Sequence, residues 1–361
     1  MDHGPLPVQD APFLVAYATD TARGRQLRRS LPSRAWSMWR YRELLPVNDY
    51  ESRIDLGAGG TPLVRLQRLM GSGSNVWIKD ESGNPTGSFK ARGLSLAVNR
   101  ARELGAPGVS LPSAGNAAVA AAAYCAAANL RCRVAMPMTT PEKVTRRCRA
   151  LGAEVLIIGQ DLTESAAQLR EYNDGFWDLS TFKEPYRVEG KKTIGFELVE
   201  QLDWTSPDWI VCPTGGGTGI VALQKAFKEL AELGIVTEYS PRLVAVQMEG
   251  CAPIVAAFEA GADHAVAWSR PTTKAWGLRV PISVADFLIL NALRESGGTA
   301  VAVPEDSIAS IQQRAASQEG LLVGPEGAAA LAGLETLLRL GTVKRSETVV
   351  VLQTGSPDNY A

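Results

Sequence analysis

The sequence predicts an α/β fold built on parallel strands. From residue 76 onward, short apolar segments alternate with loops and helical stretches, an order that favours a parallel sheet with right-handed crossovers. Several of these strands run into loops rich in glycine, serine and asparagine, at the end of a sheet where open α/β folds bind ligands. With 361 residues, 45% of them hydrophobic, the chain is long enough for two domains or one large one.

Charge and composition exclude several classes of protein. The formal net charge of -1 argues against a nucleic-acid partner, which would require a clear basic excess. We interpret the early arginines as a solvated helix face or an oligomer contact. Residues 1–10 lack a basic region and the apolar stretch 13–18 is too short to be a signal peptide or a membrane span. We therefore expect a cytoplasmic protein without a membrane segment.

Cysteine and histidine usage limits the chemistry. The five cysteines contain no C-x-x-C pair and their number is odd, so we expect small buried side chains rather than a disulfide framework. The only histidines are His3, near the terminus, and His264, which we interpret as structural. A metal site rich in histidine and a histidine-based triad are thus nearly excluded, and no metal is predicted. Proton transfer would rest on lysine, carboxylates or hydroxyls.

The segment that ends in Lys90 carries the most specific chemistry. After a strand at 76–79, residues 84–87 (Asn-Pro-Thr-Gly) predict a turn. Ser88 is then expected to be the N-cap of a helix, with Lys90 as its second residue. The positive end of the helix dipole disfavours an ammonium ion there, and a neutral amine can attack the aldehyde of a cofactor. The alternative is a solvated surface lysine that happens to follow a turn.

Two further loops are suited to binding anions. A strand at 109–111 leads through residues 112–116 into an alanine-rich helix from 117 to about 129. Another strand at 209–212 leads through Pro-Thr-Gly-Gly-Gly-Thr-Gly into a helix at 220–233. Free N–H groups at a helix start bind anions, and glycines let the backbone curl around them. The second loop has neither the Walker A pattern nor the glycine pattern of dinucleotide-binding loops, so we expect it to hold the phosphate group of a different kind of ligand.

The remaining segments complete the alternation. Further predicted strands lie at 133–136, 155–158, 243–246 and 348–352, with helices opened by Thr140-Pro141-Glu142-Lys143 and beginning at Ile194. We expect Pro141 at the first helical position. The last strand is followed by Gln353-Thr354-Gly355-Ser356.

Taken together, these motifs resemble threonine synthase-like enzymes of the fold type II family of pyridoxal 5'-phosphate (PLP) enzymes. Matching segments span residues 57 to 356, and they include 57–63, 79–93, 113–116, 184–193, 213–219, 277–281 and 325–329. The resemblance implies two domains, each a mostly parallel sheet flanked by helices, in a homodimer. It implies a large cofactor-binding domain (48–95 and 188–361) and a small mobile domain (96–187), and we interpret residues 1–47 as an N-terminal arm packed on this body.

The resemblance also implies a role for each site residue. Lys90 would bind PLP covalently and move the Cα proton, and Thr354 would face the pyridine nitrogen. The cofactor phosphate would be held by Gly215, Gly216, Gly217, Thr218 and Gly219. The substrate carboxylate would be held by Ser113, Ala114, Gly115 and Asn116, and Asn116 would also contact the phenolic oxygen of the cofactor. Arg187, with Lys183 close to it in sequence, would bind a substrate phosphate.

The implied reaction is that of a lyase acting at Cβ and Cγ, converting O-phospho-L-homoserine to L-threonine and phosphate. Three departures from the family pattern concern the substrate phosphate: Ala117 stands in place of threonine, Thr181-Phe182 in place of Asn-Ser, and the glycine loop lacks an asparagine. These departures keep an alternative open, namely β-elimination as in serine and threonine dehydratases, or β-replacement on another β-substituted amino acid. A two-lobed binding protein without catalysis is a third hypothesis.

Overall fold

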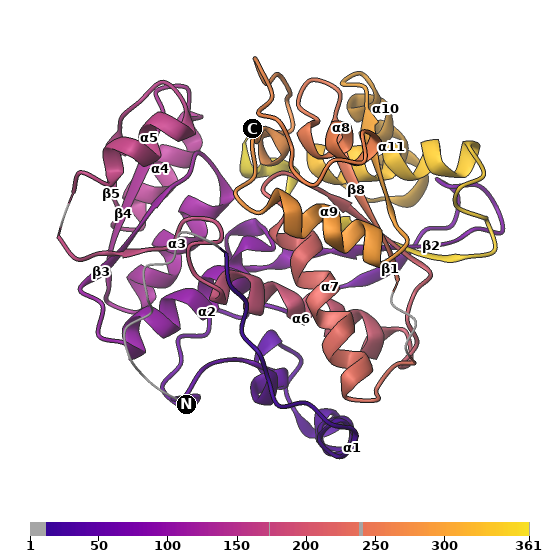
Figure 1. Ribbon diagram of the computed structural model, residues 1–361, viewed down its shortest axis with the longest axis horizontal. Helices are drawn as coiled ribbons and strands as arrows, with labels where there is room; N and C mark the ends of the chain where they lie inside the picture. Colours follow the sequence, from indigo (N-terminus) through magenta and orange to yellow (C-terminus); the bar gives the residue numbers. More distant parts are fainter. Residues whose placement is uncertain (1–11, 173, 238–240, 361) are drawn as a thin grey trace.

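The chain folds around two sheets, seen in a computed structural model that describes residues 12–172, 174–237 and 241–360. A six-stranded sheet has the order β1-β2-β10-β7-β8-β9, with only β1 antiparallel to its neighbour. A four-stranded parallel sheet has the order β5-β4-β3-β6. The two sheets lie in separate halves of the molecule, each flanked by helices (Figure 1). This arrangement confirms the predicted fold class. His3 and the other residues before 12 lie outside the described part.

The strands and helices follow one another through both halves. The strands are β1 (Leu63–Arg65), β2 (Asn75–Asp80), β3 (Gly108–Pro112), β4 (Arg131–Met136), β5 (Glu154–Ile157), β6 (Trp177–Asp178), β7 (Trp209–Pro213), β8 (Arg242–Met248), β9 (Thr299–Val303) and β10 (Thr348–Gln353). The α-helices are α1 (Thr21–Ser30), α2 (Lys90–Glu103), α3 (Asn116–Ala127), α4 (Glu142–Ala150), α5 (Leu162–Leu169), α6 (Tyr186–Gln201), α7 (Thr218–Glu232), α8 (Pro253–Glu259), α9 (Asp286–Glu295), α10 (Ser307–Arg314) and α11 (Pro325–Arg339).

Five predicted helix starts differ from the structure, and two of them, α3 and α7, begin only one and two residues earlier than predicted. Helix α2 begins at Lys90 itself, so the lysine is the first helical residue rather than the second. Pro141 has an extended ψ of 132° and is the N-cap of α4 rather than its first residue. Helix α6 begins at Tyr186, two turns before the predicted Ile194. There the Glu184 carboxylate accepts a hydrogen bond from the Arg187 amide at 3.0 Å, which satisfies one of the free donors at the helix start.

Strand β7 is buried on both faces of the large sheet. Ile210 and Cys212 pack in one hydrophobic core with residues of α6, α7 and α9, whereas Trp209 and Val211 pack in another with α10 and α11. Successive side chains of a strand point to opposite faces. A strand covered by helices on both sides therefore reads as a continuous apolar run.

The small sheet shares its core with the N-terminal segment. The buried alanines of α3 pack with α2, β3 and β4, and with Met38 and Trp39, whereas Leu27 and Leu31 pack in the large-sheet core. The described part of residues 1–47 therefore contacts both halves. Because β1, β2 and β7–β10 share one sheet and β3–β6 the other, we propose domain boundaries near 95/96 and 187/188.

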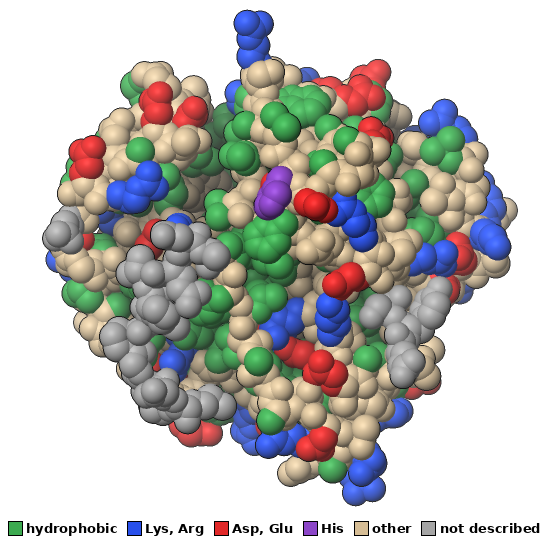
Figure 2. Space-filling model, viewed as in Figure 1, with side chains coloured by type: hydrophobic (Ala, Val, Ile, Leu, Met, Phe, Trp, Pro, Cys, Tyr) green, Lys and Arg blue, Asp and Glu red, His purple; other side chains and the backbone are tan. Residues whose placement is uncertain are grey.

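The surface is mixed in charge. Lysine and arginine side chains are interspersed with aspartate and glutamate on the face in Figure 2, without a continuous basic field. Within the described residues, no helix is both long and apolar enough to cross a bilayer. All five cysteines lie in the described part and are buried and unpaired, as expected from the sequence.

Candidate active site

Lys90 is placed by a tight turn and a neighbouring strand end. Thr86 and Gly87 have φ values of 62° and 76°, and the Gly87 amide donates to Asn84 O at 2.8 Å, which is the turn predicted from Asn-Pro-Thr-Gly. The Phe89 amide donates to Thr354 O at 3.0 Å, so the start of α2 is tied to the end of β10. The buried Ser88 hydroxyl, expected to cap the helix, has no hydrogen-bond partner within the described residues.

The surroundings of Lys90 favour its neutral form. Burial, followed by the nearby Arg187 guanidinium, lowers the pKa of Lys90 to about 8, against the smaller opposing effects of Glu326 and Cys212. Its Nζ lies 4.3 Å from the centre of the Phe89 ring. The sequence argument used the helix dipole, but the dominant cause in the structure is burial. A partly buried amine with a pKa near 8 is suited to nucleophilic attack and proton transfer.

The glycine loop between β7 and α7 presents unused backbone donors. Gly217 adopts φ 76°, and a Cβ there would lie 1.9 Å from the Ile289 side chain. The Thr214 amide donates to Val246 O and the Val221 amide to Gly217 O; within the described residues, none of the amides between them has a protein acceptor. A Cβ on Gly216 would meet only Thr181 Cγ2, at 3.5 Å. These free amides at the start of a 15-residue helix fit a phosphate group.

The loop before α3 lies next to the end of β10. The Ser113 hydroxyl accepts hydrogen bonds from the Ala118 amide at 3.2 Å and the Gly115 amide at 3.4 Å, so it acts as a cap for α3. Asn116 Nδ2 lies 3.2 Å from the position that a Cβ on Gly355 would occupy. Asn116 is therefore close to Gly355, the residue that follows the buried Thr354. Ala114, in the same loop, is partly exposed.

Tyr360 also contributes to this loop, although sequence reasoning missed it. Its hydroxyl accepts a hydrogen bond from the Asn116 amide at 3.4 Å and would lie 2.5 Å from a Cβ on Gly115. Two hydrogen bonds to Gly87 O hold the turn before it: one from the Asn359 side chain and one from the Ser356 amide, each 2.8 Å long. No local sequence signal marks this contact, because it depends on how residues 356–360 cross the Lys90 turn.

The two basic residues expected to bind a substrate phosphate differ in position. Arg187, the second residue of α6, is 4% exposed; its Nη1 donates to Leu179 O at 2.6 Å, and its Nε has no partner within the described residues. Lys183 is exposed, and no described contact brings its side chain to Lys90 or Arg187. Phe182, expected in place of a polar contact, packs in the large core with φ 64°.

Three buried titratable residues beside Arg187 and Lys90 were also missed. Glu326 accepts a hydrogen bond from the Gly277 amide at 2.8 Å, and burial raises its pKa. Burial raises the pKa of Glu184 to about 7, and its Oε1 has no partner in the described structure. Lys191 Nζ donates to Arg187 O at 3.1 Å, and burial lowers the pKa of Lys191 well below its usual value. The pattern of apolar and polar residues along α6 did not predict that Lys191 is buried, because nearly all residues of this helix are buried, including the charged ones.

A second group of buried charges forms a network at the start of α2, the helix that begins at Lys90. Lys79 Nζ lies 2.9 Å from Glu197 Oε2, and Arg92 contacts Glu81 Oε2 at 2.6 Å and Glu197 Oε1 at 2.7 Å. All four side chains are fully enclosed. Arg92 lies two residues after Lys90, so this network connects α2 to β2 and α6 and orients the lysine.

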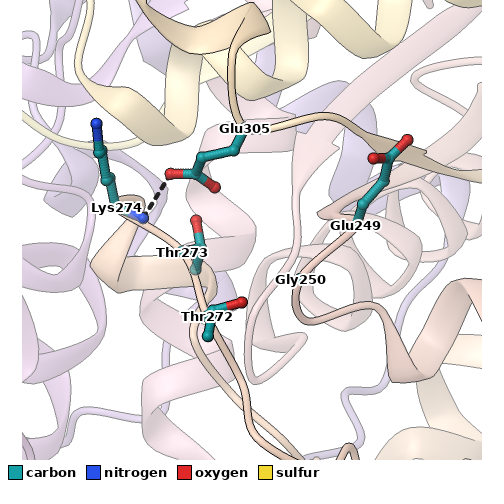
Figure 3. A pocket seen from close by; sticks show the side chains of 6 residues that line it. All are labelled: Glu249, Gly250, Thr272, Thr273, Lys274 and Glu305. Carbon is teal, nitrogen blue, oxygen red and sulfur yellow. Dashed lines mark hydrogen bonds between the residues drawn. The ribbon is translucent and has the colours of Figure 1, made fainter.

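A separate recess lies at the ends of β8 and β9 (Figure 3). It has a volume of about 380 Å³ and is lined by Glu249, Gly250, Thr272, Thr273, Lys274 and Glu305. The Lys274 amide donates to Glu305 Oε1 at 2.6 Å, while the Lys274 side chain extends away from Glu249 (Figure 3). None of the predicted site residues lines it. Two carboxylates make it unsuitable for a phosphorylated cofactor, so we assign the active site to the Lys90 region.

The residues around Lys90 fit PLP. With a pKa of about 8, the lysine amine is about half neutral at pH 8, and the unused amides of the glycine loop match a phosphate dianion. Thr354 is hydrogen-bonded to the start of α2 through the Phe89 amide, and Asn116 lies next to Gly355. Lys90 would hold the aldehyde and the glycine loop the phosphate.

Comparisons with known proteins give the same assignment. A family model described as pyridoxal-phosphate dependent enzyme matches residues 54–355. Threonine synthase from Methanosarcina acetivorans is 39% identical, covering 88% of this chain and 79% of that protein. Threonine synthase from Methanocaldococcus jannaschii is 34% identical, covering 94% and 85%. The processed form of threonine deaminase isoform 2 from Solanum lycopersicum is 25% identical, with a TM-score of 0.70 over 98% of this chain and 95% of that one. The chain therefore belongs to the family of pyridoxal-phosphate-dependent enzymes, and PLP is its cofactor.

Proposed function

We propose that the protein converts O-phospho-L-homoserine and water to L-threonine and inorganic phosphate. In this reaction the Cα proton and one Cβ proton are removed, and the Cγ–O bond breaks with loss of phosphate. A proton is then added at Cγ, the hydroxyl group of water becomes bonded to Cβ, the second proton of water leaves with the phosphate, and Cα regains its proton. The relatives at 34% and 39% identity, both named threonine synthase, support the proposal. So does the excess of buried cations around the site.

Each part of the site has a task in this reaction. Bound PLP supplies an electron sink that makes loss of the Cα proton feasible. The Lys90 amine, with its pKa lowered to about 8, accepts and returns protons at Cα. The 113–116 loop binds the substrate carboxylate at the start of α3, with Tyr360 holding its Asn116 amide.

The observation that carries the proposal is the state of Arg187. It is nearly enclosed, its Nε has no partner, and within the described residues it forms no ion pair. A buried guanidinium without a carboxylate is costly. A ligand with a phosphate group would compensate it through charge-assisted hydrogen bonds.

A second candidate is β-elimination from serine, threonine or another β-substituted amino acid. The observation that favours it is Phe182, which is packed in the core and offers no polar group to a substrate phosphate. The structural similarity to threonine deaminase from Solanum lycopersicum also supports this second candidate.

One assay separates the two candidates. The holoenzyme is incubated with O-phosphohomoserine, serine or threonine, and inorganic phosphate, threonine and α-keto acid are measured side by side. We expect phosphate and threonine in equal amounts from O-phosphohomoserine. Arg187→Met should lower kcat/KM for this substrate by about two decades, as expected for losing a charged anchor, whereas the exposed Arg149→Met control should match wild type. Keto acid from serine or threonine, without phosphate release from O-phosphohomoserine, would overturn the proposal.

We further propose that the enzyme is a cytoplasmic homodimer. Exposed apolar side chains at Val266, Ile282 and Val284, which are 84%, 49% and 56% exposed, support a contact between copies. Sedimentation equilibrium should give twice the monomer mass of 38.6 kDa. A monomer at micromolar concentration would contradict the dimer.

A further inference from the structure

Lys191 is a buried lysine for which the cofactor chemistry described above has no task. It is fully enclosed, and its Nζ donates one hydrogen bond, to Arg187 O at 3.1 Å. In the described structure no carboxylate lies within 4.0 Å of this ammonium group. Buried lysines are normally paired or neutral, because burying an isolated ammonium ion is very unfavourable.

The neighbours of Lys191 are mostly cationic. Arg187 lies one turn before it on α6, and Lys90 faces it from α2; Nζ of Lys191 lies 5.6 Å, and Nζ of Lys90 4.3 Å, from the centre of the same Phe89 ring. The acidic group that faces it is Glu184, which precedes α6. One oxygen of Glu184 accepts from the Arg187 amide, and the other has no partner in the described structure.

A charge count shows which ligand would stabilise this cluster. The glycine loop provides backbone donors for the cofactor phosphate, and Lys90 is used by the cofactor aldehyde. Arg187 then remains as a guanidinium without an ion-pair partner among the described residues, and Lys191 as a buried amine that would become a second cation on taking up a proton, with Glu184 as the carboxyl group that faces them. A monoanion would compensate the guanidinium alone, and a dianion would also compensate the ammonium form of Lys191.

We propose that Lys191 is a positioning residue that selects substrates whose distal group carries two negative charges. This inference rests on the proposed function and deepens it. In this role Lys191 acts through Arg187 rather than on the substrate: its Nζ is hydrogen-bonded to Arg187 O, which holds the first turns of α6, and its ammonium form would add positive charge close to Arg187. A dianion at Arg187 favours the ammonium form of Lys191, so the lysine takes up a proton when such a ligand binds. This second charge compensates for the polar contact that Phe182 does not provide.

The test compares two unreactive ligands of the same length on the holoenzyme. L-2-amino-5-phosphonopentanoate carries a distal dianion, and L-2-aminoadipate carries a distal monoanion in the same place. We expect Lys191→Met to weaken phosphonate binding by about tenfold or more, since a charge-assisted interaction is worth at least that factor. Aminoadipate binding should change much less, and Lys191→Arg should restore the preference for the phosphonate. The control is Lys228→Met, which removes an exposed, ion-paired lysine of α7.

Proton uptake provides a readout that a merely structural role would not change. Calorimetry in two buffers of different ionisation enthalpy, at a pH where the phosphonate is fully ionised, should show proton uptake with wild type and none with Lys191→Met. If Lys191→Met keeps the wild-type preference and the wild-type proton uptake, the role of Lys191 is disproved while phosphate release from O-phosphohomoserine can still stand. If wild type does not bind the phosphonate, both the proposed function and this inference fail.

Discussion

Lys79 and Lys191 are both completely buried lysines, yet their surroundings are opposite. Lys79 lies 2.9 Å from the Glu197 carboxylate and donates to Thr61 O and Gln201 Oε1, both at 2.8 Å. Lys191 has a single carbonyl acceptor and, among the described residues, no carboxylate partner. We call Lys79, Glu81, Arg92 and Glu197 the paired region, and Lys90, Glu184, Arg187 and Lys191 the unpaired region. Helices α2 and α6 contribute residues to both regions.

The difference separates structural charges from functional ones. In the paired region two cations meet two carboxylates with close contacts, so each charge is stabilised by its neighbours in the free protein. In the unpaired region Glu184 and Glu326 lie nearby, but among the described residues no carboxylate forms an ion pair with Lys90, Arg187 or Lys191, and binding a phosphorylated ligand would add negative charge. The pKa values are shifted in both regions: burial disfavours the charged forms of Lys90, Glu184 and Lys191, whereas at Glu197 ion pairing outweighs burial, lowers the pKa and so favours the charged form.

The largest expected effect comes from breaking the paired region. Lys79→Met leaves Glu197 with only Arg92 as a cationic partner inside the core. We expect the free energy of unfolding to fall by about 3–5 kcal/mol, the usual cost of removing one partner from a buried ion pair. Urea denaturation of the apoprotein measures it. A loss below about 1 kcal/mol would show that the network does not stabilise the fold.

The pH dependence of the free energy of unfolding tests the unpaired region at Glu184, its buried carboxyl group. Burial raises its pKa from 4.5 to about 7, so between these values the folded state keeps a proton that the unfolded state has lost. The free energy of unfolding should therefore decrease as pH rises from 4.5 to 7, by at most about 3 kcal/mol at 1.4 kcal/mol per pKa unit.

Glu184→Gln keeps an acceptor for the Arg187 amide but cannot ionise. Denaturation curves across this pH range should be flatter for the variant, which should be the more stable protein at pH 8. Glu197 of the paired region has a lowered pKa, so its contribution has the opposite sign and is lost in acid. If the free energy of unfolding changed equally with pH in wild type and in Glu184→Gln, the assignment of Glu184 as a buried, unpaired carboxyl group would be contradicted.

A smaller effect concerns the rate at which apoprotein takes up PLP. Only the neutral Lys90 amine attacks the aldehyde, and its pKa is lowered to about 8. Below that value the neutral fraction falls tenfold per pH unit, so the uptake rate should rise with pH and level off above about 8. Absorbance of the bound cofactor follows the rate, and borohydride reduction followed by peptide mapping should place the label on Lys90. A rate still rising steeply between pH 9 and 10, or a label on another lysine, would contradict this account.

The sequence predicted the regular part of the fold because that part is encoded locally. Apolar runs such as 209–212 mark buried strands, and turn residues such as 84–87 mark the loops between them. Three short strands were missed, namely β1, β6 and β9; the last is a mostly apolar run of five residues, Thr299–Val303, that lies far from any motif. The predicted start of α6 lay too far along the chain because Pro185 and the charged residues that follow it are typical of a loop. In the structure the residues that follow Pro185 are helical and their side chains are buried against α2 and α7.

The candidate site was predicted where residues adjacent in sequence form one motif, as in the Lys90 turn and the glycine loop. It was incomplete where tertiary packing decides. Tyr360 reaches the α3 loop only because the last turn is bound to Gly87 O. Lys183 and Arg187 looked equivalent in sequence, but the helix start at Tyr186 buries only Arg187. Lys191 looked like an ordinary helix residue, and only its burial without a carboxylate distinguishes it.

The most direct test of the central claim is the stability of Lys191→Met apoprotein without ligand. A methionine of similar shape removes the unpaired amine and fills the same space, and replacing a buried polar or charged group by an apolar one of similar shape is often neutral or stabilising. We predict a free energy of unfolding in urea within about 1 kcal/mol of wild type, or above it, in contrast to Lys79→Met. A loss of several kcal/mol, like that expected for Lys79→Met, would show that Lys191 stabilises the fold and would contradict its assignment to anion binding.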